Sequence, residues 1–133
     1  MKIISVDDIN AIKTASKIIT AGGLVVYPTD TLYGFGVDSR NLSAINKINE
    51  IKKRNSPISI ICWSINVFSK WVEISKENLI EAKKYLNESS TIILPVKKNI
   101  VHSTILGPNE TLGIRMPQYQ FPINLCSELN LPI

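Results

Sequence analysis

The sequence predicts an α/β (α+β) protein in which a β-sheet is covered by helices. Apolar residues recur at helical spacing in two segments, three further segments suit helices, and short apolar runs suited to strands lie between them. No repeat or low-complexity linker divides the 133 residues, of which 44% are hydrophobic. We therefore expect one domain over residues 1–133. The alternation of helices and strands leaves the strand order open.

Five segments predict helices. In Val6–Thr20 isoleucines and alanines recur every three or four residues, Ser5 or Asp7 can cap the start, and Gly22 and Gly23 can end the helix. The other expected helices are Asn41–Lys53, a short one at Asn66–Val72, Glu77–Leu86 with Ser75 as its N-cap, and Ile123–Leu129 after Pro122.

Four short runs predict strands: Leu24–Tyr27, Ile58–Trp63, Thr91–Val96 and Thr111–Met116. Ile58–Trp63 is apolar at consecutive positions, which favours a central strand buried on both faces.

Composition narrows the class of protein. The formal net charge of +4 favours anionic partners, but the lysines are scattered more than in a nucleic-acid-binding stripe. Cys62 and Cys126 have no metal-ligand spacing, so we expect reduced core thiols and no metal site. No apolar run has the length of a membrane span or a signal peptide, so we expect a soluble, cytoplasmic protein with no membrane partner.

One segment combines residue types that suit ligand binding. Pro28-Thr-Asp-Thr-Leu-Tyr-Gly-Phe-Gly36 follows an expected strand and offers two hydroxyls, a carboxylate and a phenol beside two glycines. Ligands of α/β proteins tend to bind beyond the carboxyl ends of strands, and glycine permits close backbone approach or positive φ. The alternative is a tight connection capped by Asp30 and Thr31. The residues alone favour neither interpretation.

A second candidate is the basic run Lys52-Lys-Arg54 at the end of an expected helix. Cations there are stabilised by the helix dipole by about 0.3–1 kcal/mol, which is a sufficient structural reason for them. The functional alternative is a phosphate clamp, for which Arg offers a planar fork of donors and Lys a mobile charge.

A resemblance adds to these observations. Gly22-Gly-Leu-Val-Val-Tyr-Pro-Thr-Asp-Thr-Leu-Tyr-Gly-Phe-Gly-Val-Asp38 resembles the signature of the YrdC/YciO family. Three further segments match that family in order: Lys52-x-Arg54, Thr91-Ile-Ile-Leu-Pro95 and Thr111-Leu-Gly-Ile-Arg-Met-Pro117. The resemblance implies a three-layer fold, with a twisted mixed β-sheet flanked by helices on both faces.

The family's activity is the synthesis of threonylcarbamoyl-AMP from ATP, L-threonine and bicarbonate, for tRNA modification. The resemblance implies that Lys52 and Arg54 are catalytic and bind the nucleotide phosphates, with Mg²⁺ carried in by ATP. It implies that Thr29, Thr31 and Tyr33 line the substrate pocket and that Arg115 meets a carboxylate or phosphate. We expect Asp30 to hold the loop's own amides, because one carboxylate makes a poor magnesium site. His102 is expected in an exposed loop without a role.

The family continues past its last helix into a strand and an S-x-N element, which we expect this chain to lack. An open sheet edge would follow, and we expect a second copy or a homologous partner to cover it. Two alternative functions remain: a truncated or degenerate non-catalytic paralogue, and a module that binds tRNA or double-stranded RNA.

Overall fold

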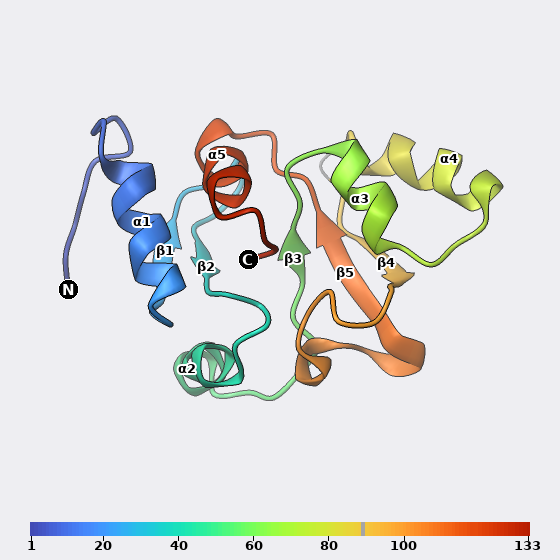
Figure 1. The fold of residues 1–133 in the computed structure, drawn as a ribbon, viewed down its shortest axis with the longest axis horizontal. Helices are drawn as coiled ribbons and strands as arrows, with labels where there is room; N and C mark the ends of the chain where they lie inside the picture. Colours follow the sequence, from blue (N-terminus) through green and yellow to red (C-terminus); the bar gives the residue numbers. More distant parts are fainter. Residues whose placement is uncertain (89) are drawn as a thin grey trace.

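A computed structural model describes residues 1–88 and 90–133 (Figure 1). The elements in chain order are α1 (Ala11–Thr20), β1 (Val25–Tyr27), β2 (Gly34–Gly36), α2 (Leu42–Lys52), β3 (Ile60–Ile61), α3 (Ile65–Trp71), α4 (Lys76–Leu86), β4 (Ile92–Pro95), β5 (Thr111–Arg115) and α5 (Gln120–Leu129). Two 3₁₀ turns, η1 (Ser103–Ile105) and η2 (Pro108–Glu110), precede β5.

The strands form two sheets across the described residues. β1 and β2 pair antiparallel as a hairpin, with Val26 opposite Phe35. The other sheet has the order β3-β5-β4, with β3 parallel and β4 antiparallel to β5. The mixed strand directions and the α+β class agree with the prediction. β2 was not predicted, because Gly-Phe-Gly lacks the β-branched run that identifies a strand. The expected central strand, β3, lies at an edge of its sheet.

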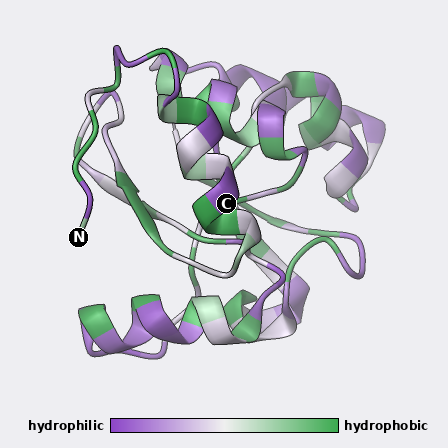
Figure 2. Cartoon of the chain, turned by 60° about the vertical axis from the view of Figure 1, so that its left-hand side comes forward, coloured by the Kyte–Doolittle hydropathy of each residue, from purple (hydrophilic) through white to green (hydrophobic). Residues whose placement is uncertain are grey.

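Helices cover the strands from both sides. One core cluster joins α1 and α5 to Tyr27 of β1 and Ile61 of β3. The other joins α2, α3 and α4 to the three-stranded sheet, and Phe68 of α3 is fully buried in it. Figure 2 shows apolar and polar residues interleaved along the helices, as expected for helices that bury one face only.

The helix boundaries differ from prediction at the N-terminus. α1 begins at Ala11 rather than Val6, because Ser5–Asn10 form turns instead. The Asp8 carboxylate accepts a hydrogen bond from the Asn10 amide at 2.7 Å, a local bond that competes with the helix. Ile9, one of the isoleucines of the expected helix, lies in these turns and is exposed.

Helix caps agree better with the sequence. The Ser75 hydroxyl accepts from the Asn78 amide at 3.2 Å, the cap that was expected for α4. Asn41 caps α2 in the same way through the Ala44 amide, at 3.1 Å. α5 begins at Gln120, three residues earlier than expected, with Pro122 in its first turn, where the missing amide hydrogen costs no bond.

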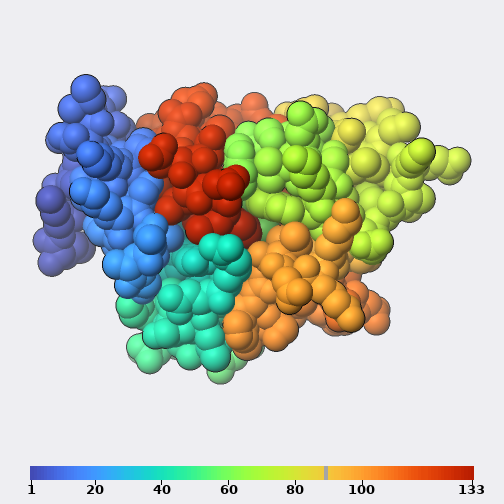
Figure 3. Space-filling model, viewed as in Figure 1, coloured from blue at the N-terminus to red at the C-terminus, as the bar shows by residue number. Residues whose placement is uncertain are grey.

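The C-terminal residues lie between the two sheets. The Pro132 carbonyl accepts bonds from the Ser39 amide at 3.4 Å and the Ser39 hydroxyl at 2.7 Å, just after β2. The Ile133 carbonyl accepts from the Ile61 amide of β3 at 3.1 Å. Figure 1 places the C-terminus between β2 and β3, and Figure 3 shows the C-terminal part of the chain (red) in contact with its neighbours.

This arrangement bears on the sheet edge. The Cys62 amide points to β5, so the preceding Ile61 amide points to the outer edge of β3, where Ile133 meets it. The chain itself therefore contacts the edge at this point. A partner chain on the edge remains a prediction.

No helix of the described residues is both long and apolar enough to cross a membrane.

Replacing Ile133 by alanine is expected to lower the free energy of unfolding by roughly 2–3 kcal/mol, because its side chain is only 6% exposed and packs in the α1–α5 core. Urea unfolding monitored by circular dichroism measures the change. Ile3→Ala is the control, since Ile3 is 85% exposed, and it should change stability by no more than about 0.5 kcal/mol. Equal effects of the two substitutions would contradict the packing role of Ile133.

Candidate functional site

The ligand-binding segment proposed from the sequence forms the connection between β1 and β2. Residues 29–33, here called the hairpin loop, leave β1 after Pro28 and return into β2 at Gly34. Of the Pro28–Gly36 segment, expected to be one connection, the last three residues, Gly34–Gly36, form β2. This confines the candidate ligand-binding side chains to a short loop between two paired strands.

The buried Tyr27 ring explains the two glycines. A Cβ at Gly36 would lie 2.7 Å from Tyr27 Cε1, and one at Gly34 would lie 3.3 Å from the same ring. Gly34 and Gly36 therefore permit close packing, and neither adopts a positive φ. Burial raises the pKa of the Tyr27 phenol far above its ordinary value. Tyr27 thus stays neutral as a platform beneath the hairpin.

Asp30 joins the hairpin loop to the end of β5. One carboxylate oxygen accepts from Arg115 Nη2 at 2.7 Å, and the other accepts from the Gln118 amide at 3.1 Å. The two charged side chains are 17% and 18% exposed, so solvent screens the pair weakly. Asp30 was expected to hold its own loop's amides. It holds an amide from a different segment, because the loop folds onto the 115–118 stretch.

The two threonine hydroxyls are part of the same network. Arg115 Nη1 donates to Thr31 Oγ1 at 3.3 Å, and the Thr29 and Thr31 hydroxyl oxygens lie 3.3 Å apart. Thr29 Oγ1 also accepts from the Thr31 amide at 3.2 Å and donates to the Leu32 carbonyl. The structure therefore brings together three of the proposed substrate-binding residues: Thr29, Thr31 and Arg115.

The tip of the loop is open to solvent. Tyr33 is 73% exposed and Leu32 is 80% exposed. Tyr33 lies two residues after Thr31 along the chain, at the end of the hairpin loop. A ligand that bound the loop would meet an exposed apolar residue and a phenol at its rim.

The basic run lies at the end of α2, as predicted. Lys52 is the last helical residue, and Lys53 ends the helix in the left-handed conformation with φ of 52°. Lys52 Nζ lies 5.5 Å from the centre of the Phe35 ring, within the range of a cation–π contact. This contact places Lys52 beside β2 rather than on the hairpin loop. Arg54 is exposed just beyond the helix.

The described residues do not build a metal centre. They contain no group of three or more His, Cys, Asp or Glu side chains placed to hold an ion. The two Asp30 oxygens accept hydrogen bonds from Arg115 and from the Gln118 amide. Cys62 and Cys126 are both buried free thiols. Burial raises the pKa of the Cys62 thiol to about 12.

The sequence did not predict some residues that shape the candidate site. Tyr27 was read only as the end of a strand, and Gln118 acts through its backbone, which no side-chain pattern reveals. Phe35 beneath Lys52 belongs to the unpredicted β2. His102 is half-buried rather than exposed, and its Nδ1 accepts from the Thr104 amide at 3.2 Å as the cap of η1.

A double-mutant cycle of Asp30→Ala and Arg115→Ala is expected to give a coupling energy of about 1–3 kcal/mol, because the pair is short and largely buried. Urea unfolding of the wild type, both single variants and the double variant measures it. The Asp38–Arg40 pair is the matched control: Arg40 is 52% exposed, and exposed pairs couple by about 0–1 kcal/mol. A coupling at Asp30–Arg115 no larger than the control would show that this pair does not fasten the loop.

The chain is similar to known proteins in both sequence and fold. Residues 17–133 match the Sua5/YciO/YrdC family, which carries the description telomere recombination. A threonylcarbamoyl-AMP synthase of Hydrogenovibrio crunogenus is 33% identical over 128 residues, covering 92% of this chain and 68% of that protein. A threonylcarbamoyl-AMP synthase of Pyrococcus abyssi is 32% identical, and the match covers only 36% of its length.

Solved structures agree with the sequence matches. The crystal structure of P. abyssi Sua5 complexed with L-threonine has a TM-score of 0.79 and 30% identity, covering 91% of this chain and 36% of that one. Escherichia coli YciO has a TM-score of 0.81 and 25% identity, covering 91% and 60%. With the match extending over nearly the whole sequence, the chain belongs to the Sua5/YciO/YrdC family.

Proposed function

We propose that this chain is a threonylcarbamoyl-AMP synthase domain that binds L-threonine at the hairpin loop. The observation that carries the proposal is the joined group of Thr29, Thr31 and Arg115, in a fold shared with a protein complexed with L-threonine. The site combines hydroxyl oxygens with a guanidinium, which suits a small zwitterion. The same proposal places the protein in the cytoplasm, where ATP and tRNA are both present.

The proposed reaction joins three substrates. The amine of threonine combines with bicarbonate to give a carbamate and water, and a carbamate oxygen then attacks the α-phosphorus of ATP. The bond to the β-phosphate oxygen breaks, and pyrophosphate leaves. Such a reaction needs the protein chiefly to position the reactants and to stabilise phosphate charge.

Lys52 and Arg54 are the proposed phosphate ligands. Both are exposed at the end of α2, and neighbouring Lys53 adds a third cation. Lys52 lies over Phe35, whose strand leads directly out of the hairpin loop. A cation held there is free to turn toward a phosphate near the loop, because a cation–π contact at an exposed site is worth only about 0.5–1 kcal/mol. ATP would bring Mg²⁺ with it, bound largely through its own phosphates and water.

The proposal predicts pyrophosphate release from ATP that requires both L-threonine and bicarbonate. Lys52→Ala and Arg54→Ala should each lower kcat/KM by about 10²-fold, the loss typical of removing one stabilising donor. Lys13→Ala, which removes an exposed lysine of α1, is the control and should leave the rate unchanged. A coupled pyrophosphate assay measures these rates.

Two outcomes would redirect the proposal. Absence of both pyrophosphate release and ATP binding at millimolar concentration would exclude the enzyme. Binding of ATP and threonine without turnover would instead support a non-catalytic paralogue, for which co-purification of a fuller homologue is the further expectation.

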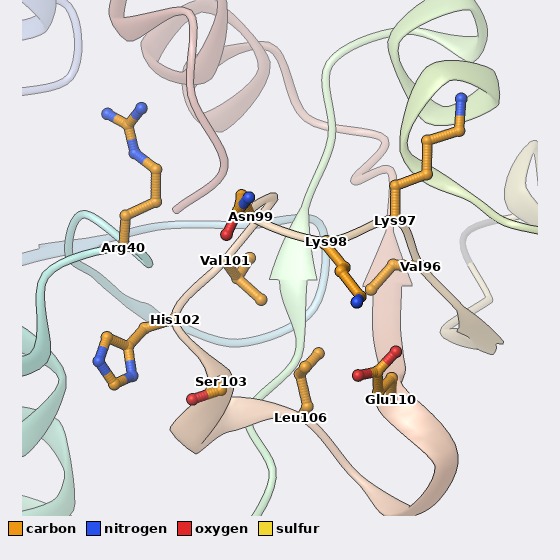
Figure 4. Close-up of a pocket in the computed structure, with 10 residues that line it drawn as sticks. All are labelled: Arg40, Val96, Lys97, Lys98, Asn99, Val101, His102, Ser103, Leu106 and Glu110. Atoms are coloured by element: carbon orange, nitrogen blue, oxygen red, sulfur yellow. The ribbon is translucent and has the colours of Figure 1, made fainter.

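RNA binding is a second candidate function, favoured by a separate cavity. The cavity has a volume of about 490 Å³, and the cations Arg40, Lys97 and Lys98 line it together with His102 and one carboxylate, Glu110 (Figure 4). Figure 4 shows Lys97 turned away from the Lys98 side chain. Pro95 pairs with Thr111 and Ile92 with Ile114, so this cavity lies at the opposite end of β5 from Arg115, roughly 13 Å along the strand.

Replacement of Lys97 and Lys98 by alanine is expected to weaken tRNA binding and to reduce the slope of log K against log salt by up to about 1–2, since each lost phosphate contact removes about 0.7–0.9. Fluorescence anisotropy with labelled tRNA at several salt concentrations measures both quantities. Lys13→Ala combined with Lys17→Ala removes the same charge from α1. If this control weakens binding equally, the cavity is not the RNA contact.

A further inference from the structure

The cavity at the start of β5 is separate from the hairpin loop. The connection between β4 and β5 supplies most of its lining residues, and Arg40, which follows β2, lines one side (Figure 4). Its volume of about 490 Å³ lies within the roughly 300–1,000 Å³ of pockets that hold small ligands. The side chains around the cavity therefore define a ligand by their chemistry.

One side of the cavity presents hydrogen-bond donors. Figure 4 shows Arg40 and His102 on this side and Glu110 on the other. The Ser39 carbonyl accepts from the His102 amide at 2.8 Å, which ties His102 to the residue before Arg40. His102 Nδ1 accepts from the Thr104 amide at 3.2 Å. Because an amide nitrogen only donates, the proton of the neutral ring lies on Nε2, which is then a donor.

Two lysines add positive charge to the cavity. Lys97 and Lys98 are exposed, and the ion pairs in the described part of the chain join other side chains. A lysine ammonium on its flexible stem can move to an anion that binds nearby. Arg40 directs Nε and Nη2 to Asp38, and a guanidinium has five N–H donors, so this pair does not use all of them. The donors together suit a phosphate group, which has three strong acceptor oxygens.

The opposite side of the cavity presents a single carboxylate. Asn109 and Glu110 adopt positive φ of 59° and 57°, a conformation that is uncommon for a glutamate and is concentrated at functional sites. The Val96 amide donates to the Glu110 carbonyl at 3.2 Å and holds the residue at the cavity. A carboxylate only accepts hydrogen bonds, so a ligand must offer N–H or O–H groups here, and a phosphate is repelled.

The cavity also has an apolar wall. Val96, Val101 and Leu106 line it, and both valines are buried. Contacts to the phosphates and sugars of a nucleic-acid backbone would leave this wall unused, whereas a flat heterocycle would cover it. The cavity thus suits a ligand with a phosphate at one end, a heterocycle in the middle and N–H donors at the other end.

Guanine is the RNA base that fits these requirements. Its Watson–Crick edge has two adjacent donors, N1–H and the N2 amino group, which match the two oxygens of a carboxylate. Adenine and cytosine place an acceptor nitrogen beside their amino group, and the N–H of uracil lies between two carbonyls. In a duplex the Watson–Crick edge is already paired, so the base must be unpaired to be recognised there.

Resting on the RNA-binding function above for its RNA source, we propose that the cavity binds one unstacked guanine nucleotide. The phosphate lies at Arg40 and His102, the base covers the apolar wall, and N1–H and the N2 amino group donate to Glu110. An unpaired guanine of an RNA and a free guanosine monophosphate share this chemistry. The experiments below distinguish the two sources.

Mononucleotides test the site without RNA. GMP, AMP and IMP, which lacks the N2 amino group, are titrated into the full 133-residue chain, and ¹H–¹⁵N NMR gives the dissociation constants. GMP should bind about 10-fold more tightly than IMP or AMP, the difference expected for one hydrogen bond to a charged group. The amide signals that shift should belong to residues 97–103 rather than to the hairpin loop.

Glu110→Gln keeps the size of the side chain and removes its charge. The affinities for GMP and IMP should then agree within about twofold, because the bond that separates them is lost. Glu81→Gln is the matched control, since Glu81 is an exposed carboxylate of α4, and it should leave the preference for GMP unchanged. Arg40→Ala should weaken GMP and IMP by the same factor, because both carry the phosphate. If Glu110→Gln does not fold, Glu110→Ala provides the same comparison.

Three RNAs distinguish the two sources of the nucleotide. A hairpin with one unpaired guanine, the same hairpin with inosine in its place and a fully paired duplex are compared by fluorescence anisotropy. If RNA is the source, the guanine hairpin should bind about 10-fold more tightly than the inosine hairpin. The duplex should bind no more tightly than the inosine hairpin, and Glu110→Gln should remove the preference for guanine.

The results separate this inference from the RNA-binding function. Equal affinities for GMP and IMP, together with equal affinities for the two hairpins, would overturn the inference even if tRNA binds. Shifts confined to the hairpin loop and Lys52 would also overturn it, because GMP would then occupy the proposed ATP site. If GMP binds with the expected preference but no RNA binds, the RNA-binding function fails, and the inference stands with the free nucleotide as the ligand.

Discussion

The ion pair between Asp30 and Arg115 is the interaction on which the candidate site depends. It joins the hairpin sheet to the end of β5 in the other sheet, across 85 positions of sequence. Both side chains are mostly buried, so neither charge is easily solvated without the other, and the pair holds its geometry. The Gln118 amide shares the Asp30 carboxylate and fixes its second oxygen. The loop is consequently held from outside as well as by its own strands.

This constraint divides the site into a rigid part and an adaptable part. The threonine hydroxyls and Arg115 occupy set positions, which suits recognition of a small ligand whose groups must be placed accurately. Lys52 and Arg54 have long exposed side chains and suit the diffuse charge of a polyphosphate. A reaction that joins a small zwitterion to a nucleotide needs both properties.

Sequence patterns anticipated the features that depend on local interactions. The Ser75 cap, the end of α2 near Lys52 and the strands around Ile92 and Ile114 follow from spacing and capping, which act within a few residues. The resemblance of the Pro28–Gly36 segment identified the family. The sequence pattern did not predict β2, because its two glycines are there to pack against the Tyr27 ring. The alternation of apolar and polar residues that identifies a strand does not reveal such a contact. Sequence patterns also missed the Gln118 amide, because a backbone donor carries no residue signature.

The position of Pro132 and Ile133 has a consequence for how the protein is made. These residues bond to Ser39 and Ile61, which the ribosome releases about 70 or more residues earlier. The apolar residues of β1 and β3 that pack against this segment therefore stay uncovered until residues 131–133 emerge. Contacts of such long sequence separation form late and slowly, and waiting intermediates are prone to aggregate. The junction between the sheets thus makes the protein most prone to aggregate during synthesis, before residues 132 and 133 have been released from the ribosome.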